Sequence, residues 1–282
     1  EEAKTGVTVL LFDKKTGAVV GVDISGGGPA SRETPLTSPV TADNPINAIV
    51  LSGGSAYGLA ASDGVMRCLE EHGIGFETGY AKVPLVCQSC IYDLGYGSAT
   101  VRPDSEMGYA ACEKALAGGN PSSGSVGAGT GATVGKICGM ERAMKSGLGM
   151  YAVQLGELRM AAVVAVNALG DIFDSSTGRK IAGLRTEDGT AFSDSCEELW
   201  KMGQRENLFT GNTTIGAVIT NGKFNKAQMN KIASMTRNAY ARCINPVGTM
   251  ADGDSIYAAS AGEVEVDLNV AGTLAAYVME RA

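Results

Sequence analysis

Histidine is almost absent from this 282-residue sequence, which contains only His72. A site with two histidine ligands for zinc is therefore excluded, and a Ser-His-Asp or Cys-His mechanism would have to use His72. That residue lies in "EEHGIG", a pattern typical of the last turn and C-cap of a helix. If the chain is a hydrolase, we expect its base to be an amine, a lysine or a carboxylate.

The sequence also lacks long apolar runs and an excess of positive charge. No run approaches the roughly 18 apolar residues that cross a bilayer. The net charge of -7 and the pI near 4.9 argue against nucleic acid or an anionic membrane as a partner. The sequence begins Glu1-Glu2-Ala3-Lys4, without methionine or a signal-like core, which suggests a trimmed N-terminus. These features predict a cytoplasmic protein.

The seven cysteines are an odd number scattered along the chain, which predicts reduced, mostly buried thiols rather than a disulfide framework. Cys87 and Cys90 have C-x-x-C spacing, but no second pair completes a zinc site. We therefore expect two thiols in a buried segment there. The sequence predicts neither a metal nor a cofactor.

Hydrophobic periodicity predicts alternating strands and helices in one domain, residues 1–282. The runs 6–13 and 17–24 are typical of a β-hairpin, and no internal repeat or domain linker is present. The spacing lacks clean βαβ units, which favours an α+β layered sandwich over a parallel doubly wound sheet. Strands are expected at 47–51, 148–155, 160–168, 214–220 and 255–261, an apolar run at 83–92, helices at 55–71, 109–117, 225–240 and 267–280, and an exposed polar excursion at 174–212.

Two glycine-containing segments invite ligand interpretations. "GSVGAGTGATVGK" fails as a phosphate-binding P-loop, because Ile137 follows Lys136 where Ser or Thr should bind magnesium. It remains either a flexible loop or a backbone cradle closed by Lys136. "DGDSIYAASAGE" fails as a calcium loop, because Tyr257 occupies the position that needs glycine. Taken alone, Asp252 and Asp254 are typical of a solvated turn before a strand.

Three segments together resemble one known family. "GNTTIGAVITN", "VGTMADGDSIYAASAGEVEVD" and "NAIVLSGGSAYGLAASDGVM" are similar to the DmpA-type peptidases, self-cleaving N-terminal-nucleophile hydrolases that include β-aminopeptidases, D-aminopeptidases and nylon-oligomer hydrolases. The resemblance covers essentially the whole chain and is closer to the nylon-hydrolase side. It implies an αββα four-layer sandwich of the DmpA/ornithine-acetyltransferase type, and an amidohydrolase or aminopeptidase acting on small amides or peptides.

The resemblance also implies that the chain cuts itself between Asn212 and Thr213. The Thr213 hydroxyl would attack the Asn212 carbonyl, and water would release the resulting ester. Residues 1–212 and 213–282 would stay associated, in a homotetramer of such cleaved heterodimers. The new α-amino group of Thr213, with a pKa of about 7.7–8.0, would then serve as the base of the mature enzyme.

Further site residues follow from the resemblance. It makes Lys136 a catalytic lysine that stabilises an oxyanion or activates the threonine, and Asn167 an oxyanion-hole amide. Asp252 and Asp254 would orient the Thr213 hydroxyl and hold its amine. From its local sequence alone, Asn167 is typical of a turn at the end of a strand. Tyr92 matches a pocket tyrosine, with core packing as the alternative.

One position departs from the β-aminopeptidase pattern. That branch carries a glutamate that binds the amino group of the substrate, where this sequence has Cys90. Two other functions remain open from sequence. The first is an acyl transferase like ornithine acetyltransferase, whose cleavage motif differs from Asn212-Thr213-Thr214. The second is an uncut binding or scaffold protein.

Overall fold

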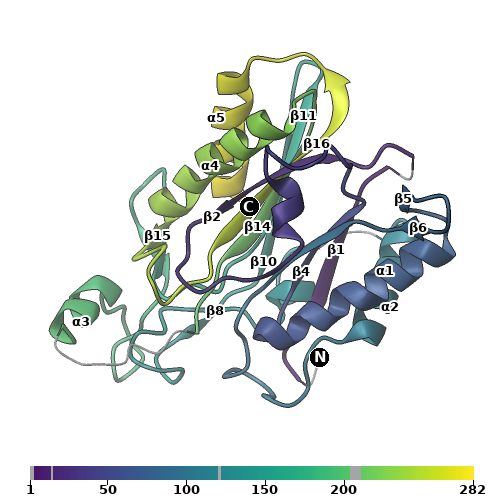
Figure 1. Cartoon of the computed structure of the whole chain (residues 1–282). Helices are drawn as coiled ribbons and strands as arrows, with labels where there is room; N and C mark the ends of the chain where they lie inside the picture. The colour runs from purple at the N-terminus through teal and green to yellow at the C-terminus, as the bar shows by residue number, and fades with distance from the viewer. Residues whose placement is uncertain (1–2, 14, 120–121, 204–210) are drawn as a thin grey trace.

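Two β-sheets pack face to face between two pairs of helices, as the computed structural model of residues 3–13, 15–119, 122–203 and 211–282 shows (Figure 1). The first sheet has the order β1-β4-β7-β3 and the second the order β10-β11-β14-β16-β2. Helices α1 and α2 cover the first sheet, and α4 and α5 cover the second. This is the αββα sandwich that the resemblance implied.

The elements have the following bounds. The strands of the two large sheets are β1 Val7–Leu11, β2 Val19–Ile24, β3 Ala30–Arg32, β4 Ala48–Ser52, β7 Val86–Cys90, β10 Leu148–Leu155, β11 Leu158–Ala165, β14 Ile215–Gly222 and β16 Ser255–Val264. The shorter strands are β5 Phe76–Glu77, β6 Lys82–Val83, β8 Thr133–Val134, β9 Met144–Lys145, β12 Asp171–Phe173, β13 Lys180–Ala182 and β15 Ile244–Asn245. The helices are α1 Ala61–Glu71, α2 Ser105–Leu116, α3 Ser195–Lys201, α4 Lys226–Cys243 and α5 Leu268–Arg281, with 3-10 turns at Thr34–Thr37, Ser55–Ala60 and Gly127–Gly129.

Strand β14 illustrates why these residues build a sandwich. Ile215 and Ala217 point into the core between the two sheets, whereas Val218 points into the core beneath α4 and α5. Successive side chains of a strand face opposite sides of the sheet, so an unbroken apolar run suits a strand that is covered on both faces. In β4 the alternation is the same, with Ile49 between the sheets and Val50 beneath α1.

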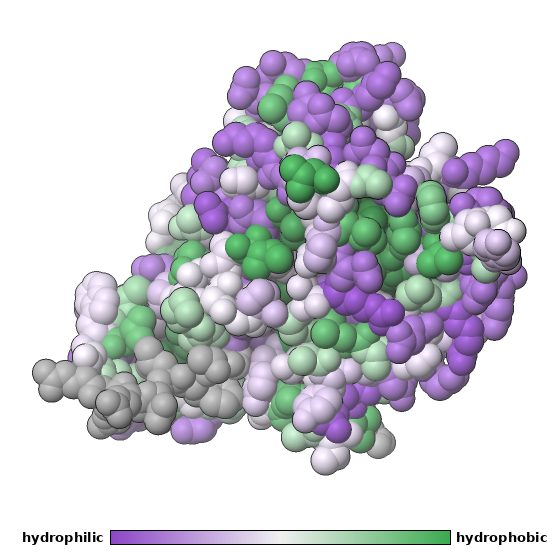
Figure 2. Space-filling model, viewed as in Figure 1, coloured by the Kyte–Doolittle hydropathy of each residue, from purple (hydrophilic) through white to green (hydrophobic). Residues whose placement is uncertain are grey.

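Polar N-cap residues define where helices α4 and α5 of the outer layer begin. Asn225 caps α4 in a capping box with Gln228, and Asp267 accepts hydrogen bonds from the first turn of α5. Figure 2 shows hydrophilic side chains over much of the outer helical layers, while hydrophobic residues gather in the middle of this face, between the two layers. The helices thus present a polar side to the exterior and an apolar side to a sheet.

The expected hairpin of 6–13 and 17–24 is wrong in its pairing. Both strands exist, but β1 pairs antiparallel with β4 in the first sheet, and β2 pairs antiparallel with β16 in the second. The chain between them crosses from one sheet to the other. The local sequence pattern predicts that both segments form strands. The partner of each strand depends on tertiary packing, because β1 and β2 belong to different sheets.

The other expected elements agree with the structure within a few residues. The helix expected at 55–71 begins with a 3-10 turn before α1, and His72 is its C-cap, as predicted. The stretch 174–212 is less irregular than expected, because it contains β13 and α3, and residues 204–210 of it lie outside the described residues. All seven cysteines are free thiols, and four of them are buried. Within the described residues, no helix is long and apolar enough to cross a membrane.

Candidate active site around Thr213

Thr213 lies just before β14 and is buried between the backbone segments that contain Asn167 and Asp252. Its residue surface is 4% exposed, and that of Asn212 is 3% exposed. Asn212 forms a parallel bridge with Asp252, and the backbone N–H of Thr213 donates to the carbonyl oxygen of Asn167 at 3.0 Å. The peptide bond between Asn212 and Thr213 is therefore held on both sides by ordered backbone.

The carbonyl oxygen of Asn212 accepts two hydrogen bonds. The N–H of Gly253 donates to it at 2.9 Å, and the hydroxyl of Thr213 forms a short hydrogen bond to it. A backbone N–H aimed at a carbonyl oxygen is also placed to stabilise negative charge that develops there. The hydroxyl of Thr213 and a polarised carbonyl group thus lie side by side. Sequence analysis missed Gly253, although it lies between the two aspartates that it singled out.

Lys136 follows the glycine loop and reaches the same place from another segment. Its Nζ lies 2.8 Å from the backbone oxygen and 2.8 Å from the Oδ1 of Asn167, and 3.5 Å from the oxygen of Gly211. Burial of the amine lowers the pKa of Lys136 to about 7, although the nearby Asp252 and Asp254 act in the opposite direction. A lysine in this state is partly neutral at physiological pH.

Asn167 is fully buried and connects Lys136 to Thr213. Its backbone oxygen accepts from both Lys136 Nζ and the N–H of Thr213, while its side-chain oxygen accepts from Lys136 and from the N–H of Thr133. Its Nδ2 donates to the backbone oxygen of Tyr92 at 2.9 Å. Since an amide nitrogen carries two hydrogens, one remains after this bond. The residue is central to the site rather than a simple turn at a strand end.

Asp252 and Asp254 are buried, so the solvated turn that their local sequence suggested is wrong. Asp254 accepts hydrogen bonds from the N–H groups of Thr214 and Gly248, and Asp252 accepts from the N–H and hydroxyl of Thr249. Burial, followed by the charge of Asp252, raises the pKa of Asp254 to about 7. Through these hydrogen bonds the two carboxylates fix the backbone around Thr213.

A cavity of about 110 Å³ opens beside Gly211. Tyr92 and Lys136 both border it, so the structure brings Tyr92 to the site. The cavity is lined by Tyr92, Asp93, Gly95, Tyr96, Thr133, Lys136, Gly139, Met140 and Gly211. Asp93, which sequence analysis missed although it follows Tyr92 directly, is a buried carboxyl whose pKa is raised by desolvation. A larger groove of about 550 Å³ between β1 and β10 is mainly apolar and contains none of the predicted site residues.

Cys90, which the resemblance matched to a glutamate of β-aminopeptidases, is not among the residues that line this cavity. It is buried, and its Sγ lies 3.1 Å from the hydroxyl of Ser52. Burial raises its pKa to about 12, so the thiol is neutral at physiological pH. It therefore offers no negative charge to the amino group of a substrate. The carboxyl nearest to Tyr92 along the cavity wall is Asp93.

Comparison with known proteins gives a consistent result over the whole chain. The family model described as peptidase family S58 matches residues 1–281. A protein named as an uncharacterized aminopeptidase from Mycobacterium leprae is 38% identical over 268 residues, which are 92% of this chain and 72% of that protein. A 6-aminohexanoate-oligomer endohydrolase from Kocuria sp. is 33% identical over 273 residues, which are 94% of this chain and 72% of that enzyme.

Solved structures give the same fold at low sequence identity. The L-aminopeptidase D-Ala-esterase/amidase from Ochrobactrum anthropi, described as a variant of the Ntn-hydrolase fold, superimposes with a TM-score of 0.69 at 16% identity. That match covers 99% of this chain and 76% of the other. A β-aminopeptidase from Burkholderia sp. gives a TM-score of 0.66 at 17% identity, covering 99% of this chain. These likenesses support the architecture described above.

Proposed function

This chain belongs to peptidase family S58 and is a hydrolase of amide bonds, and from this membership we propose that it activates itself by cutting the bond between Asn212 and Thr213. The observation that carries the proposal is the contact of Thr213 Oγ1 with the Asn212 carbonyl, which also accepts a hydrogen bond from Gly253. The products are residues 1–212 and 213–282, which together form one catalytic unit.

Self-cleavage begins with attack of Thr213 Oγ1 on the carbonyl carbon of Asn212. Lys136 takes the hydroxyl proton, because a neutral amine has a lone pair left after its two N–H groups donate to the oxygens of Asn167. Negative charge develops on the Asn212 oxygen, where the N–H of Gly253 stabilises it. The C–N bond then breaks, the nitrogen of Thr213 receives the proton from Lys136, and an ester remains on Oγ1. Water hydrolyses this ester.

The mature enzyme uses the same atoms on an external amide. The free α-amino group of Thr213 takes the proton of its own hydroxyl, which attacks the substrate carbonyl and forms an acyl-Thr213 intermediate. The remaining N–H of Asn167 Nδ2 and the ammonium form of Lys136 stabilise the oxyanion. Asp252 and Asp254 lie close enough to the site for their charges to act on Lys136, and they would pair with the new amino group.

The substrate class follows from the cavity and from the relatives. A cavity of about 110 Å³ beside Gly211, bordered by Tyr92 and Lys136, fits a small amide or peptide. We infer that the enzyme does not select free amino termini through a carboxylate at position 90, because Cys90 is buried and neutral. The relatives described above are named as an aminopeptidase and a 6-aminohexanoate-oligomer endohydrolase. Amides of ω-amino acids are therefore the first substrates to compare with α- and β-amino amides.

Replacement of Thr213 by alanine tests the proposal. We expect Thr213→Ala to stay a single polypeptide and to have no amidase activity, because it lacks the attacking oxygen. The wild-type protein should separate into two polypeptides on a denaturing gel, and the smaller should begin Thr-Thr-Ile-Gly. Thr214→Ala is the matched control, since it removes the neighbouring hydroxyl, and it should still be cut. Cleavage of Thr213→Ala at the same bond would refute the assignment.

We expect a cytoplasmic protein and a homotetramer of cleaved heterodimers. The apolar groove between β1 and β10, lined by Val7, Val9, Met150 and other residues, supports burial of this face in an assembly.

A further inference from the structure

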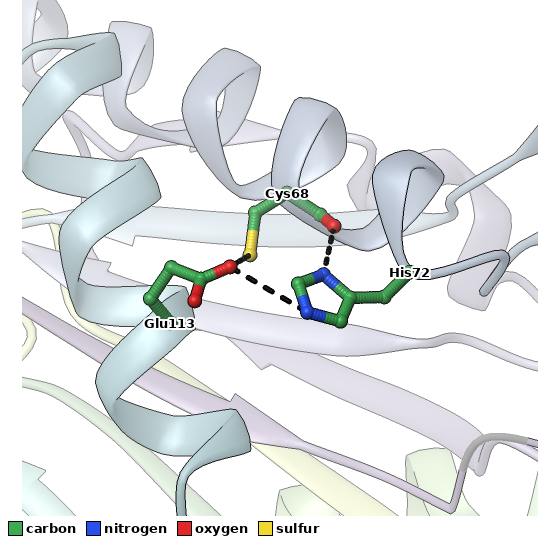
Figure 3. A group of neighbouring side chains, drawn as sticks. All are labelled: Cys68, His72 and Glu113. Carbon is green, nitrogen blue, oxygen red and sulfur yellow. Dashed lines mark hydrogen bonds and ion pairs between the residues drawn. The ribbon is translucent and has the colours of Figure 1, made fainter.

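A second cluster of chemically active side chains lies between α1 and α2, in a different layer from Thr213. Cys68 lies in α1, His72 is the C-cap of that helix, and Glu113 comes from α2 (Figure 3). Figure 3 shows Glu113 pointing across the helix interface toward both partners. One ligand atom from each residue lies within 4.8 Å of the other two. Neither the proposed mechanism nor the family comparison uses these residues.

The imidazole of His72 is oriented by its own helix. Its Nδ1 lies 2.8 Å from the carbonyl oxygen of Cys68. A carbonyl oxygen can only accept, so Nδ1 carries the proton and donates it. In the neutral imidazole, the lone pair is then on Nε2, the nitrogen that faces Glu113 Oε1 at 3.7 Å. Histidine ligands of metals commonly donate their second N–H to a carbonyl or carboxylate in this way.

Two of the three distances between the ligand atoms are close to the edges of a tetrahedral zinc site, and the third, between Cys68 and His72, is at most 4.8 Å. Zinc binds sulfur at about 2.3 Å and histidine nitrogen or carboxylate oxygen at about 2.0–2.2 Å, so a tetrahedral site has edges of about 3.3–3.6 Å. Cys68 Sγ lies 3.4 Å from Glu113 Oε1, and His72 Nε2 lies 3.7 Å from the same oxygen.

We propose that Cys68, His72 and Glu113 bind one zinc ion that joins α1 to α2. The Cys-His-carboxylate donor set suits zinc among the common divalent cations. The half-exposed side chains of His72 and Glu113 leave a path for the ion and room for a water as fourth ligand. Cys68 is buried, and its thiol is in hydrogen-bond contact with that of Cys112 on the protein side. The proposal departs from the sequence analysis, which predicted no metal.

The ion would stabilise the packing of α1 against α2 and would take no part in the hydrolysis of amides. One turn before the cluster, α1 and α2 approach so closely that a Cβ on Gly64 would lie 1.7 Å from the oxygen of Ser105. Arg67 and Glu106 also form an ion pair across this interface, and the hydroxyl of Tyr109 donates to Glu71, so zinc would add one more link between two helices that already pack together. We expect it to raise the thermal stability of the protein without changing the turnover of amides.

Cobalt titration of the mature full-length protein tests the site. The protein is treated with chelator, kept reduced, and titrated with Co²⁺, whose thiolate complexes absorb through sulfur-to-metal charge transfer. We expect one equivalent with this band, displaced by one equivalent of Zn²⁺. His72→Asn and Glu113→Gln, both at half-exposed positions, should weaken cobalt binding by about 10-fold or more. Glu106→Gln, an exposed change on the same helix, should leave it unchanged.

Two cysteine variants identify the sulfur ligand. Cys68→Ser should abolish the charge-transfer band, whereas Cys112→Ser should retain it. Zinc should also raise the melting temperature of the wild-type protein but not that of His72→Asn. The proposal is overturned if the reduced protein shows no charge-transfer band, if Cys112→Ser alone loses it, or if His72→Asn binds as tightly as wild type. A mass two hydrogens lower, with no metal binding after reduction, would instead indicate a disulfide between Cys68 and Cys112.

Discussion

Lys136 has the most perturbed environment among the residues assigned to the reaction. Its amine is surrounded by carbonyl oxygens and is removed from water, so burial lowers its pKa to about 7 from the usual 10.5. The carboxyl groups of Asp252, Asp254 and Asp93 face the same space and oppose this shift. The reactive form of the lysine is the neutral one, which predominates above the lowered pKa.

The pH dependence of self-cleavage follows from this state. As pH rises from about 6 to about 8, Lys136 loses its proton, and the cleavage rate should rise by up to about tenfold and then level off above about pH 8. The measurement is the decay of freshly translated precursor at several pH values. It is made before maturation, because the α-amino group of Thr213 does not yet exist and cannot contribute a second titration.

The pKa of Asp254 is also about 7, so the pH profile alone does not distinguish Lys136 from Asp254 as the group that titrates. A variant of Lys136 makes this distinction. Lys136→Arg keeps a long cationic side chain that does not deprotonate, and we expect its precursor to remain uncut at every pH. A wild-type rate that does not change between pH 6 and 8, or efficient cleavage of Lys136→Arg, would contradict the assignment of Lys136.

At the scale of elements, the turn before β16 positions the bond between Asn212 and Thr213, where we propose the cut. Gly253 donates its N–H to the Asn212 oxygen, and a Cβ at this position would lie 2.7 Å from the oxygen of Gly28 and 2.9 Å from Thr213 Oγ1. The turn therefore needs a residue without a side chain. Asp252 and Asp254 on either side fix it through hydrogen bonds to Thr249, Gly248 and Thr214.

Gly253→Ala should slow self-cleavage by about 100-fold, because it displaces the donor or the nucleophile by a fraction of an ångström. The rate is measured as the decay of the precursor band. Gly28→Ala is the matched control: its Cβ would meet only the oxygen of Asp252, at 3.9 Å, so its cleavage should remain close to that of wild type. Equal rates for Gly253→Ala and wild type would show that this N–H does not stabilise the transition state.

At the scale of the whole molecule, the proposed cleavage would divide the chain but not the core. Strand β14 follows the cut and pairs with β11 from the first fragment, and β16 pairs with β2. The core beneath α4 and α5 contains residues from both fragments, such as Met160 and Ile232. Separation would expose this apolar surface and leave the edges of β11 and β2 unpaired.

The two fragments should therefore elute together in size-exclusion chromatography and separate only in denaturant. The uncut Thr213→Ala protein is the reference, and it should elute at the same volume as the cleaved wild type. Intact mass spectrometry of the shared peak should give two masses that sum to the mass of the precursor plus one water. Fragments that elute separately under native conditions would show that the shared sheet does not hold them.

The sequence by itself determined most elements and the residues to examine. Apolar periodicity gave α4, α5, β14 and β16 to within a few residues, because each pattern is read over one continuous segment. The family resemblance pointed to Thr213, Lys136 and Asn167, which the structure brings together through direct hydrogen bonds.

Only the tertiary structure decided what depends on distant partners. It assigned β1 and β2 to different sheets, because strand pairing is settled by the cores that the strands cover. It buried Asp252 and Asp254, which a local pattern treats as a solvated turn, and it brought the N–H of Gly253 to the Asn212 oxygen. It also joined Cys68 and His72, four residues apart on one helix, to Glu113 of another. Burial, pairing and approach across the fold arise from residues far apart in the chain, so no local pattern contains them.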